Sequence, residues 1–148
     1  VISGSKLAVE RACEALKAEG ARRAMLLPVS APFHCSLMRP AAEKLRAALD
    51  DIEMQAPRIP LINNVDVAIE VDADKIRDAL FRQAFGAVRW VECMQALKAR
   101  GLAHIVECGP GKVLAGMVGR IDPALTGMPM FDPSTAQQAQ QVLAGDSA

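Results

Sequence analysis

The chain has 148 residues, of which 51% are hydrophobic and 23% are charged, and its 17 basic and 17 acidic side chains give zero net charge. This composition is typical of a globular domain and argues against a disordered chain. Zero net charge and the scarcity of aromatic residues argue against a nucleic acid or an anionic membrane as partner. No apolar run approaches the roughly 20 residues that span a bilayer, so we expect no membrane association.

The four cysteines are Cys13, Cys35, Cys93 and Cys108. They are widely spaced, form no C-x-x-C motif, and have no histidine at the spacing of a structural zinc site. We therefore expect reduced thiols in a cytoplasmic protein, with no bound metal and no cofactor.

The first 29 residues predict a strand, a helix and a second strand. Residues 1–4, "VISG", read as the end of a strand, so we expect a natural N-terminal part before this sequence. Residues 3–20 predict a helix with a serine cap and a stop at Gly20. Residues 21–29 predict a basic turn followed by an apolar strand that ends at Pro28. This is the second half of a small α+β unit.

A loop over residues 30–38 contains His34 and precedes a helix over 39–52, with Pro40 in its first turn. The segment "IPLIN" predicts a short buried strand. Helices are then expected over 72–85 and 88–101. Within the first of these, one face carries Ile76, Ala79, Leu80 and Gln83.

Residues 102–121 are the clearest α/β segment of the sequence. A hydrophobic strand runs into the turn Gly109-Pro110-Gly111, and a helix is expected from about Lys112. The tail that follows shows little pattern before a weak final helix. Strands that alternate with helices indicate a parallel sheet with crossover helices.

The Gly-Pro-Gly turn matches neither common phosphate-binding motif. A Walker A loop needs Ser or Thr after its lysine, and Lys112 is followed by Val113; a third glycine of G-x-G-x-x-G would fall on Leu114. A structural turn is the simpler interpretation, and anion binding at the following helix stays open.

Two asparagines, Asn63 and Asn64, follow the predicted strand "IPLIN". Ligands of open α/β sheets bind at the carboxyl ends of strands, so these amides are candidate ligand contacts. The alternative is that they hold the following turn through hydrogen bonds.

His34 also lies beyond the end of a predicted strand, whereas His104 falls within an apolar strand and is expected in the core. A histidine that acts as a general base needs a nucleophile and an acceptor for its other nitrogen. Cys35 is adjacent, but neighbouring side chains on an extended segment point to opposite sides. The sequence has no G-x-S-x-G elbow. A nucleophile for His34 is therefore expected on a part of the protein outside this sequence.

Four blocks in this order, "LPVSAPFHCSLMRPAAEKL", "PLINNVD", "IRDALFRQ" and "VECGPGKVLAGM", closely resemble the malonyl-CoA:acyl carrier protein transacylases of bacterial type II fatty-acid synthesis. The resemblance covers nearly the whole chain and implies the C-terminal half of such a protein. It implies an α/β fold: the end of a ferredoxin-like small subdomain over 1–29, and the C-terminal part of an α/β-hydrolase-like acyltransferase large domain over 30–148.

The resemblance also implies the reaction, the partners and the site. Malonyl would pass from malonyl-CoA to the phosphopantetheine thiol of acyl carrier protein through a serine on the N-terminal half. His34 matches the family's catalytic histidine, and Gln83 matches the glutamine whose backbone carbonyl orients it. Phe33 is expected to crowd the extra methyl group of methylmalonyl, unless it only packs under the loop, and Asn64 is a lower-ranked substrate contact.

Two alternatives remain open from the sequence. One is an inactive fragment or a non-catalytic module that binds a carrier protein, for which a basic patch would be needed. The candidate residues for that patch are Arg22, Arg23, Arg39, Lys44 and Arg46. The other alternative is a cysteine acyltransferase that uses Cys35 as its nucleophile.

Overall fold

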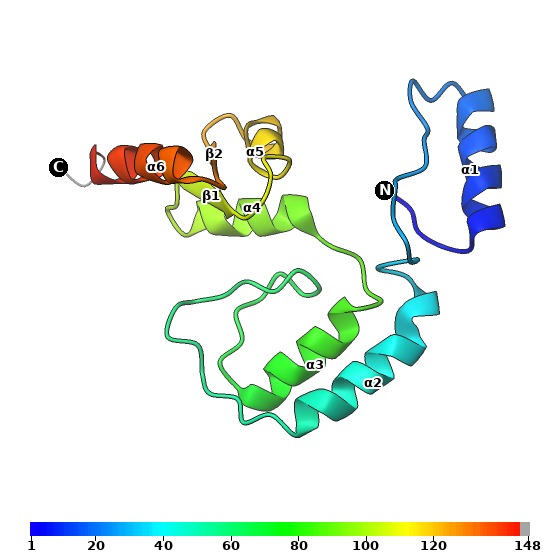
Figure 1. Ribbon diagram of the computed structural model, residues 1–148, viewed down its shortest axis with the longest axis horizontal. Coiled ribbons are helices and arrows are strands. Elements are labelled where there is room, and N and C mark those ends of the chain that lie inside the picture. The colour runs from blue at the N-terminus through cyan, green and yellow to red at the C-terminus, as the bar shows by residue number, and fades with distance from the viewer. Residues whose placement is uncertain (146–148) are drawn as a thin grey trace. The chain divides into compact units, whose positions relative to one another are not determined.

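The computed structural model describes residues 1–145, which form six α-helices, one 3₁₀ helix and two strands (Figure 1). In chain order they are α1 (Lys6–Ala18), η1 (Ser36–Met38), α2 (Arg39–Asp50), α3 (Ala73–Gln83), α4 (Trp90–Ala99), β1 (His104–Cys108), α5 (Ala115–Ile121), β2 (Thr126–Met130) and α6 (Pro133–Gly145). Contacts divide the chain into a first unit over 1–89 and a second unit from residue 90 onward. The predicted domain boundary at residue 30 stays a prediction, and residues 146–148 of that domain lie outside the described residues.

The predicted helices form, and local signals explain where several of them end. The Asp72 carboxylate accepts hydrogen bonds from the N–H groups of Asp74 and Lys75, which fixes the start of α3. Gly20, with φ of 89°, follows the last turn of α1 in the left-handed conformation that glycine adopts without strain. Ser5 occupies the predicted cap of α1 but makes no side-chain hydrogen bond there.

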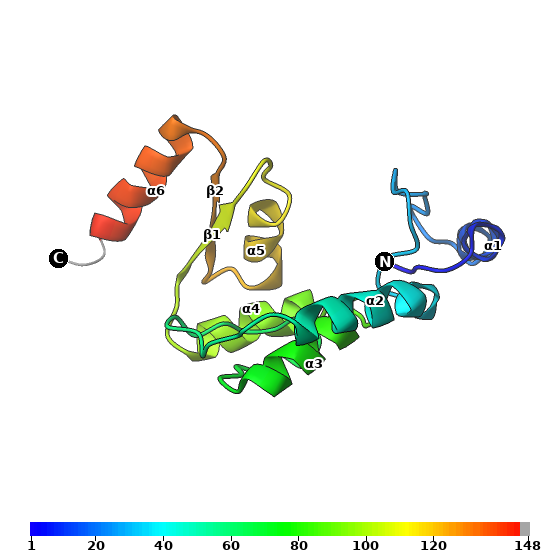
Figure 2. The ribbon, with the colours of Figure 1, turned by 60° about the horizontal axis from the view of Figure 1, so that its bottom comes forward.

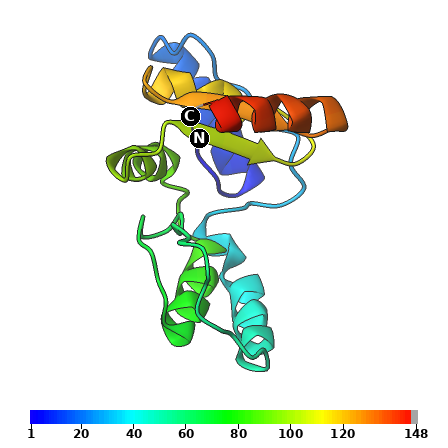
Figure 3. The ribbon, with the colours of Figure 1, turned by 90° about the vertical axis from the view of Figure 1, so that its left-hand side faces the viewer.

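Helices α2 and α3 run side by side and form the packed part of the first unit (Figure 3). The rings of Phe81 and Phe85 meet edge to face at 5.2 Å. The guanidinium groups of Arg46 and Arg39 lie over these two rings at 4.9 and 5.4 Å. Arg77, in the middle of α3, donates to one carbonyl in the last turn of α2 and to another just beyond that helix. The aromatic contacts thus hold the start of α2 against the end of α3, and Arg77 holds the end of α2.

The strands predicted at residues 1–4, 24–29 and 59–63 do not form in the structure. A strand exists only where a neighbour accepts and donates its backbone hydrogen bonds, and the described chain offers none beside these segments. The third segment makes a single antiparallel bridge, between Ile62 and Ile69. The prediction of these three strands was therefore wrong for the described chain, because local sequence does not supply a pairing partner.

The loop between these bridge residues is held by Asn63 and passes through a strained residue. The Asn63 side chain accepts from the N–H of Asp66 at 2.7 Å and donates to the carbonyl of Ala68 at 3.1 Å. Of the two predicted roles for the asparagines, the turn-holding one is therefore observed for Asn63. Val67 has φ of 59°, a conformation that a β-branched residue rarely adopts.

The second unit contains the predicted parallel sheet, reduced to two strands. Strands β1 and β2 pair in parallel from His104 opposite Thr126 to Cys108 opposite Met130. Helices α5 and α6 lie on opposite sides of the strand pair (Figure 2). Strand β2 was not predicted because its sequence, "TGMPM", contains glycine and proline, which disfavour strands. Packing against the two helices overrides that preference.

Helix α5, which follows the turn after β1, begins a few residues later in the sequence than predicted. The helix begins at Ala115 rather than at Lys112, and the Glu107 carboxylate accepts its first N–H at 2.7 Å. Gly127 of β2 lies so close to this point that an added Cβ would be 2.2 Å from the carbonyl oxygen of Ala115. The strand and the helix therefore meet backbone to backbone.

We predict that Gly127→Ala destabilises the second unit, because β2 must move away from Ala115 to make room for the methyl group. Overpacking of this kind costs about 1–3 kcal/mol, measurable by urea unfolding followed by circular dichroism. The control is Gly116→Ala in α5, where nothing lies within 4 Å of the added Cβ. The control should be neutral or stabilising by up to about 1 kcal/mol. Equal losses in the two variants would contradict the close approach.

We predict that Val67→Asn stabilises the first unit, because asparagine tolerates the left-handed backbone that strains valine. Relief of part of a strain of about 1–3 kcal/mol should raise the melting temperature measurably. Val71→Asn is the control, since Val71 is exposed and has no positive φ. A gain in the control as large as the gain at Val67 would show that side-chain polarity, not backbone strain, is responsible.

Candidate active site

His34 lies in the loop between Pro32 and η1 with a strained backbone. Its φ is 61°, in the left-handed region that residues other than glycine seldom occupy. The N–H of the preceding Phe33 donates to Ala31 at 2.9 Å, so the loop turns sharply just before the histidine. Strain of this kind persists where the surrounding structure imposes it, and it is frequent at functional sites.

The Nδ1 atom of His34 faces two backbone carbonyl oxygens. It lies 3.2 Å from the carbonyl oxygen of Gln83 and 3.2 Å from that of Gly86. A carbonyl oxygen only accepts hydrogen bonds, so Nδ1 must carry the proton for either bond to exist. In the neutral ring the lone pair is then on Nε2, on the side of the imidazole away from α3. This is the arrangement that a general base requires.

The two carbonyls are available because of how α3 ends. The last carbonyls of a helix have no partner within it, and Gln83 is the last residue of α3. The chain then turns so that the N–H groups of Phe85 and Gly86 both donate to Arg82, at 3.3 and 2.7 Å. Gly86 fits this turn because a Cβ would lie 2.8 Å from the Arg82 carbonyl oxygen. A glycine shortly after a helix is the sequence signal that could have identified Gly86, which was not predicted.

The Gln83 side chain contributes a second feature. Its amide oxygen and nitrogen are both buried, and neither has a hydrogen-bond partner among the described residues. The residue lines a cavity of about 320 Å³, and Asn64 lines the same cavity. The loop that carries Asn64 is tied to the segment between α3 and α4, because the Asn64 carbonyl accepts from the Arg89 N–H at 3.1 Å. The structure thus brings together two of the predicted site residues.

An ion-pair cluster lies beside the same turn. Arg82 donates from Nη1 and Nη2 to the two carboxylate oxygens of Asp66, at 2.6 and 2.7 Å, and from Nε to Asp78 at 2.6 Å. The hydrogen bond from Arg82 holds the pKa of Asp66 below its ordinary value. The two carboxylates raise the pKa of Arg82 above its ordinary value. Neither Arg82 nor Asp66 was identified from the sequence.

The residues that flank His34 are placed differently from it. Phe33 is 48% exposed, and both its predicted role at the acyl group and the alternative of packing under the loop stay predictions. Cys35 donates from Sγ to the carbonyl of Pro32 at 3.1 Å. Over residues 1–145 no hydrogen bond joins Cys35 to His34. The cysteine-nucleophile alternative therefore lacks the contact it needs.

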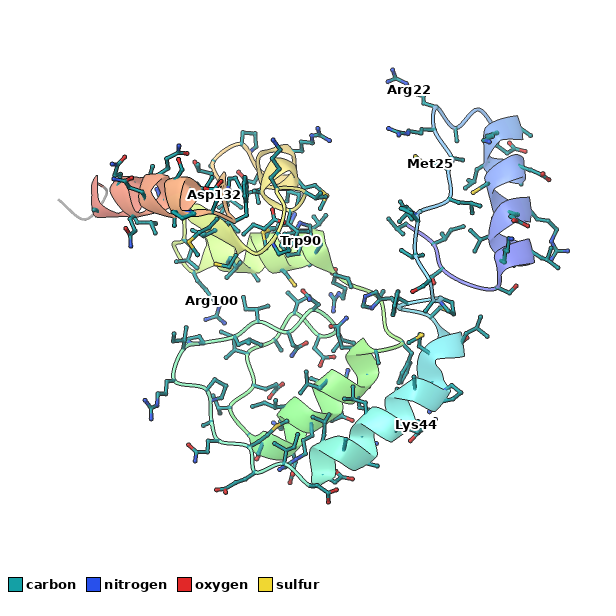
Figure 4. The ribbon with its side chains drawn as sticks, viewed as in Figure 1. Arg22, Met25, Lys44, Trp90, Arg100 and Asp132 are labelled. Carbon is teal, nitrogen blue, oxygen red and sulfur yellow. The ribbon has the colours of Figure 1, made fainter. Side chains whose placement is uncertain are left out.

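The basic residues considered for carrier-protein docking do not gather in one patch. Figure 4 places Arg22 at the turn that follows α1 and Lys44 on α2, well apart within the first unit. The guanidinium groups of Arg39 and Arg46 lie over aromatic rings instead. The Gly109–Gly111 turn belongs to the second unit.

Within the part of the chain that the structure describes, no helix is long and apolar enough to cross a membrane. Among the same residues, no group of three or more His, Cys, Asp and Glu side chains is arranged to hold a metal ion. No protein-family model matches the chain.

Comparison with known proteins gives consistent matches to one group of enzymes. The malonyl CoA-acyl carrier protein transacylase of Escherichia coli strain K12 is 49% identical over 142 residues, covering 96% of this chain and 46% of the relative. The crystal structure of an acyl-carrier-protein S-malonyltransferase from Burkholderia pseudomallei is 52% identical with a TM-score of 0.88, covering 93% of this chain and 45% of that one.

A third match is a structure of a type II polyketide synthase acyl-carrier protein in complex with its malonyl-transacylase. The matched chain of that structure is 47% identical to this one with a TM-score of 0.86, and the match covers 89% of this chain and 43% of that one. The chain spans about half the length of the curated relatives it matches. The predicted resemblance is confirmed, and the chain is homologous to the C-terminal part of the malonyl CoA-acyl carrier protein transacylases.

Proposed function

We propose that this chain carries the histidine half of a site that transfers malonyl from malonyl-CoA to the phosphopantetheine thiol of an acyl carrier protein. The observation that carries the proposal is the pair of carbonyls that faces Nδ1 of His34 and leaves Nε2 as the base. The nucleophilic serine would come from a segment that corresponds to the N-terminal part of the relatives, which this chain does not cover. The setting would be the cytoplasm.

The chemistry follows from this geometry. Nε2 of His34 takes the proton of the serine hydroxyl while the serine oxygen attacks the thioester carbonyl of malonyl-CoA. The imidazolium then protonates the departing thiolate sulfur of coenzyme A, which leaves malonyl on the serine as an ester. In the second half the same nitrogen takes the proton of the carrier-protein thiol while its sulfur attacks the ester carbonyl. The imidazolium then returns that proton to the departing serine oxygen, which frees the serine and leaves malonyl on the carrier-protein sulfur. Neutral carbonyls stabilise an imidazolium less than a carboxylate does. Because the thiol of coenzyme A is a good leaving group, this weaker stabilisation is enough for thioester exchange.

Phe33 and Asn64 are the proposed substrate contacts. Phe33 is exposed and directly precedes the proposed base, and its ring would crowd the extra methyl group of methylmalonyl. Asn64 shares a cavity with Gln83 beside the end of α3. Neither role requires a cofactor or a metal.

The proposed domain assignment is that residues 1–29 end a ferredoxin-like small subdomain and residues 30–148 belong to the α/β acyltransferase large domain. Its support is the hollow of about 730 Å³ beside α1, lined by apolar residues of the helix and of the extended segment that follows it. Met25, Leu26 and Leu27 of that segment are at least half exposed. An extended apolar segment beside an amphipathic helix is what a sheet lacking its neighbouring strands would leave.

A second candidate function is a non-catalytic module that binds a carrier protein. It is favoured by one observation, the absence of a G-x-S-x-G elbow from the sequence. The basic residues are divided between two places, the turn that follows α1 and helix α2, and this division weighs against a single docking patch for a carrier protein.

The test is a chimera in which this chain replaces the corresponding C-terminal part of the Escherichia coli relative. We expect the chimera to transfer malonyl to acyl carrier protein, and His34→Ala to lower kcat by about 10²–10⁴-fold, the usual contribution of a general base. Stopped assays with radiolabelled malonyl-CoA measure both. Full activity of the His34→Ala chimera would contradict the proposed base, and an inactive chimera that still binds the carrier protein would favour the second function.

Cys35→Ala in the same chimera separates the serine mechanism from the cysteine alternative. The Sγ of Cys35 donates a hydrogen bond to the Pro32 carbonyl, and over residues 1–145 none joins it to His34, so we expect the substitution to leave most of the activity. Loss of activity as complete as that of His34→Ala would restore Cys35 as the nucleophile.

Acyl selectivity tests Phe33. We expect Phe33→Ala to reduce the preference for malonyl-CoA over methylmalonyl-CoA by about tenfold or more in kcat/KM, since one methyl contact is worth about 1–3 kcal/mol. Leu37→Ala, another exposed apolar residue three positions beyond His34, is the control. Equal kcat/KM values for the two substrates before any substitution would contradict the role of Phe33.

A further inference from the structure

We propose that the ion pair between Arg82 and Asp66 is the positioning element of the base histidine, and that it acts through the carbonyls of Gln83 and Gly86. The inference rests on the proposed role of His34. It adds two residues, Arg82 and Asp66, that would act through the backbone carbonyls facing His34.

The pair has the geometry of a rigid clamp. Arg82 is bound to both carboxylate oxygens of Asp66 through two parallel N–H donors, and its Nε is bound to Asp78. Side chains of the pair are about one third exposed, 35% for Arg82 and 34% for Asp66. A bidentate contact fixes the direction of the guanidinium as well as its distance, which a lysine could not do.

The clamp is connected to His34 on the Arg82 side by the backbone itself. Gln83 is the next residue, and its carbonyl is one of the two that face Nδ1. Gly86, which carries the other carbonyl, donates its N–H to the Arg82 carbonyl at 2.7 Å. Any rotation of Arg82 would therefore shift both acceptors of the histidine proton.

On the other side, Asp66 ties the 63–68 loop to the same turn. Its N–H donates to the Asn63 side chain at 2.7 Å, and its carbonyl accepts from Arg89 at 3.3 Å. The neighbouring Val65 approaches Gly86 so closely that a Cβ on the glycine would lie 3.0 Å from the valine Cγ2. The 63–68 loop thus packs against the turn that follows α3, and the ion pair joins this loop to the helix.

The charges of the pair persist under ordinary conditions. The hydrogen bond from Arg82 lowers the pKa of Asp66, so the carboxylate stays ionised at neutral and mildly acidic pH. The hydrogen bonds of the clamp therefore favour the charged form of both partners, which keeps the contact between them charge-assisted.

Arg77 provides a matched control on the same helix. It also pairs with an aspartate, Asp74, and donates to backbone carbonyls, but these belong to the end of α2, away from the turn. Arg77→Lys should therefore disturb helix packing without reaching His34. A purely structural role for Arg82 would make Arg82→Lys behave like this control.

The experiment measures the tautomer of His34 by ¹⁵N NMR of the chain at a pH where the ring is neutral, in Arg82→Lys, Asp66→Asn and Arg77→Lys. We expect the Nδ1–H form to predominate in the unsubstituted chain and in Arg77→Lys. In Arg82→Lys and Asp66→Asn we expect the ring to shift toward the Nε2–H form. Asp66→Asn keeps the size of the side chain, and circular dichroism checks that each variant remains helical.

Transfer by the chimera described above supplies the second readout. We expect Arg82→Lys to lower kcat by up to about 100-fold, the effect of a displacement of about 1 Å, with KM within about twofold. An unchanged tautomer in folded Arg82 and Asp66 variants would overturn the positioning role. A changed tautomer with unchanged transfer would instead overturn the proposed role of His34, so the two failures are distinguishable.

Discussion

One imidazole nitrogen facing two backbone carbonyl oxygens is the interaction on which the site depends. Both contacts of His34 Nδ1, to Gln83 and Gly86, require a proton on that nitrogen, and they thereby leave Nε2 as the nitrogen that the proposed mechanism uses as its base. No carboxylate is needed to hold the ring. The acceptors are instead carbonyls that the end of a helix leaves unpaired, and the strained φ of His34 brings the ring to them.

The rest of the first unit holds those carbonyls in place. Helix α3 is fixed at its middle by Arg77, which donates to carbonyls at and just beyond the end of α2, and nearer its end by Phe81 beneath Arg46. At its end the Arg82–Asp66 pair joins the helix to the 63–68 loop. The geometry around His34 is thus built within residues 1–89, whereas the proposed nucleophile lies outside the chain.

Local signals in the sequence predicted the helices and the candidate histidine, and they failed where structure depends on partners distant in sequence. Asp72 and Gly20 mark helix ends through hydrogen bonds and backbone conformations that a few neighbouring residues determine. Strand β2 was missed because Gly127 and Pro129 disfavour strands, and only its packing against α5 and α6 explains it. Conversely, the apolar segment at 24–29 predicts a strand that has no neighbour to pair with in the described chain. Arg82 and Asp66 are 16 positions apart, so nothing local indicates that they form a pair.

The central claim is that this chain supplies a base without its nucleophile, and intact-mass spectrometry after incubation with malonyl-CoA tests it most directly. The account predicts no malonyl adduct on this chain by itself. In the chimera it predicts one adduct, on a serine outside this sequence, at a rate that depends on His34. A malonyl group mapped by peptide fragmentation to Cys35, or to any serine of this chain, would contradict the account.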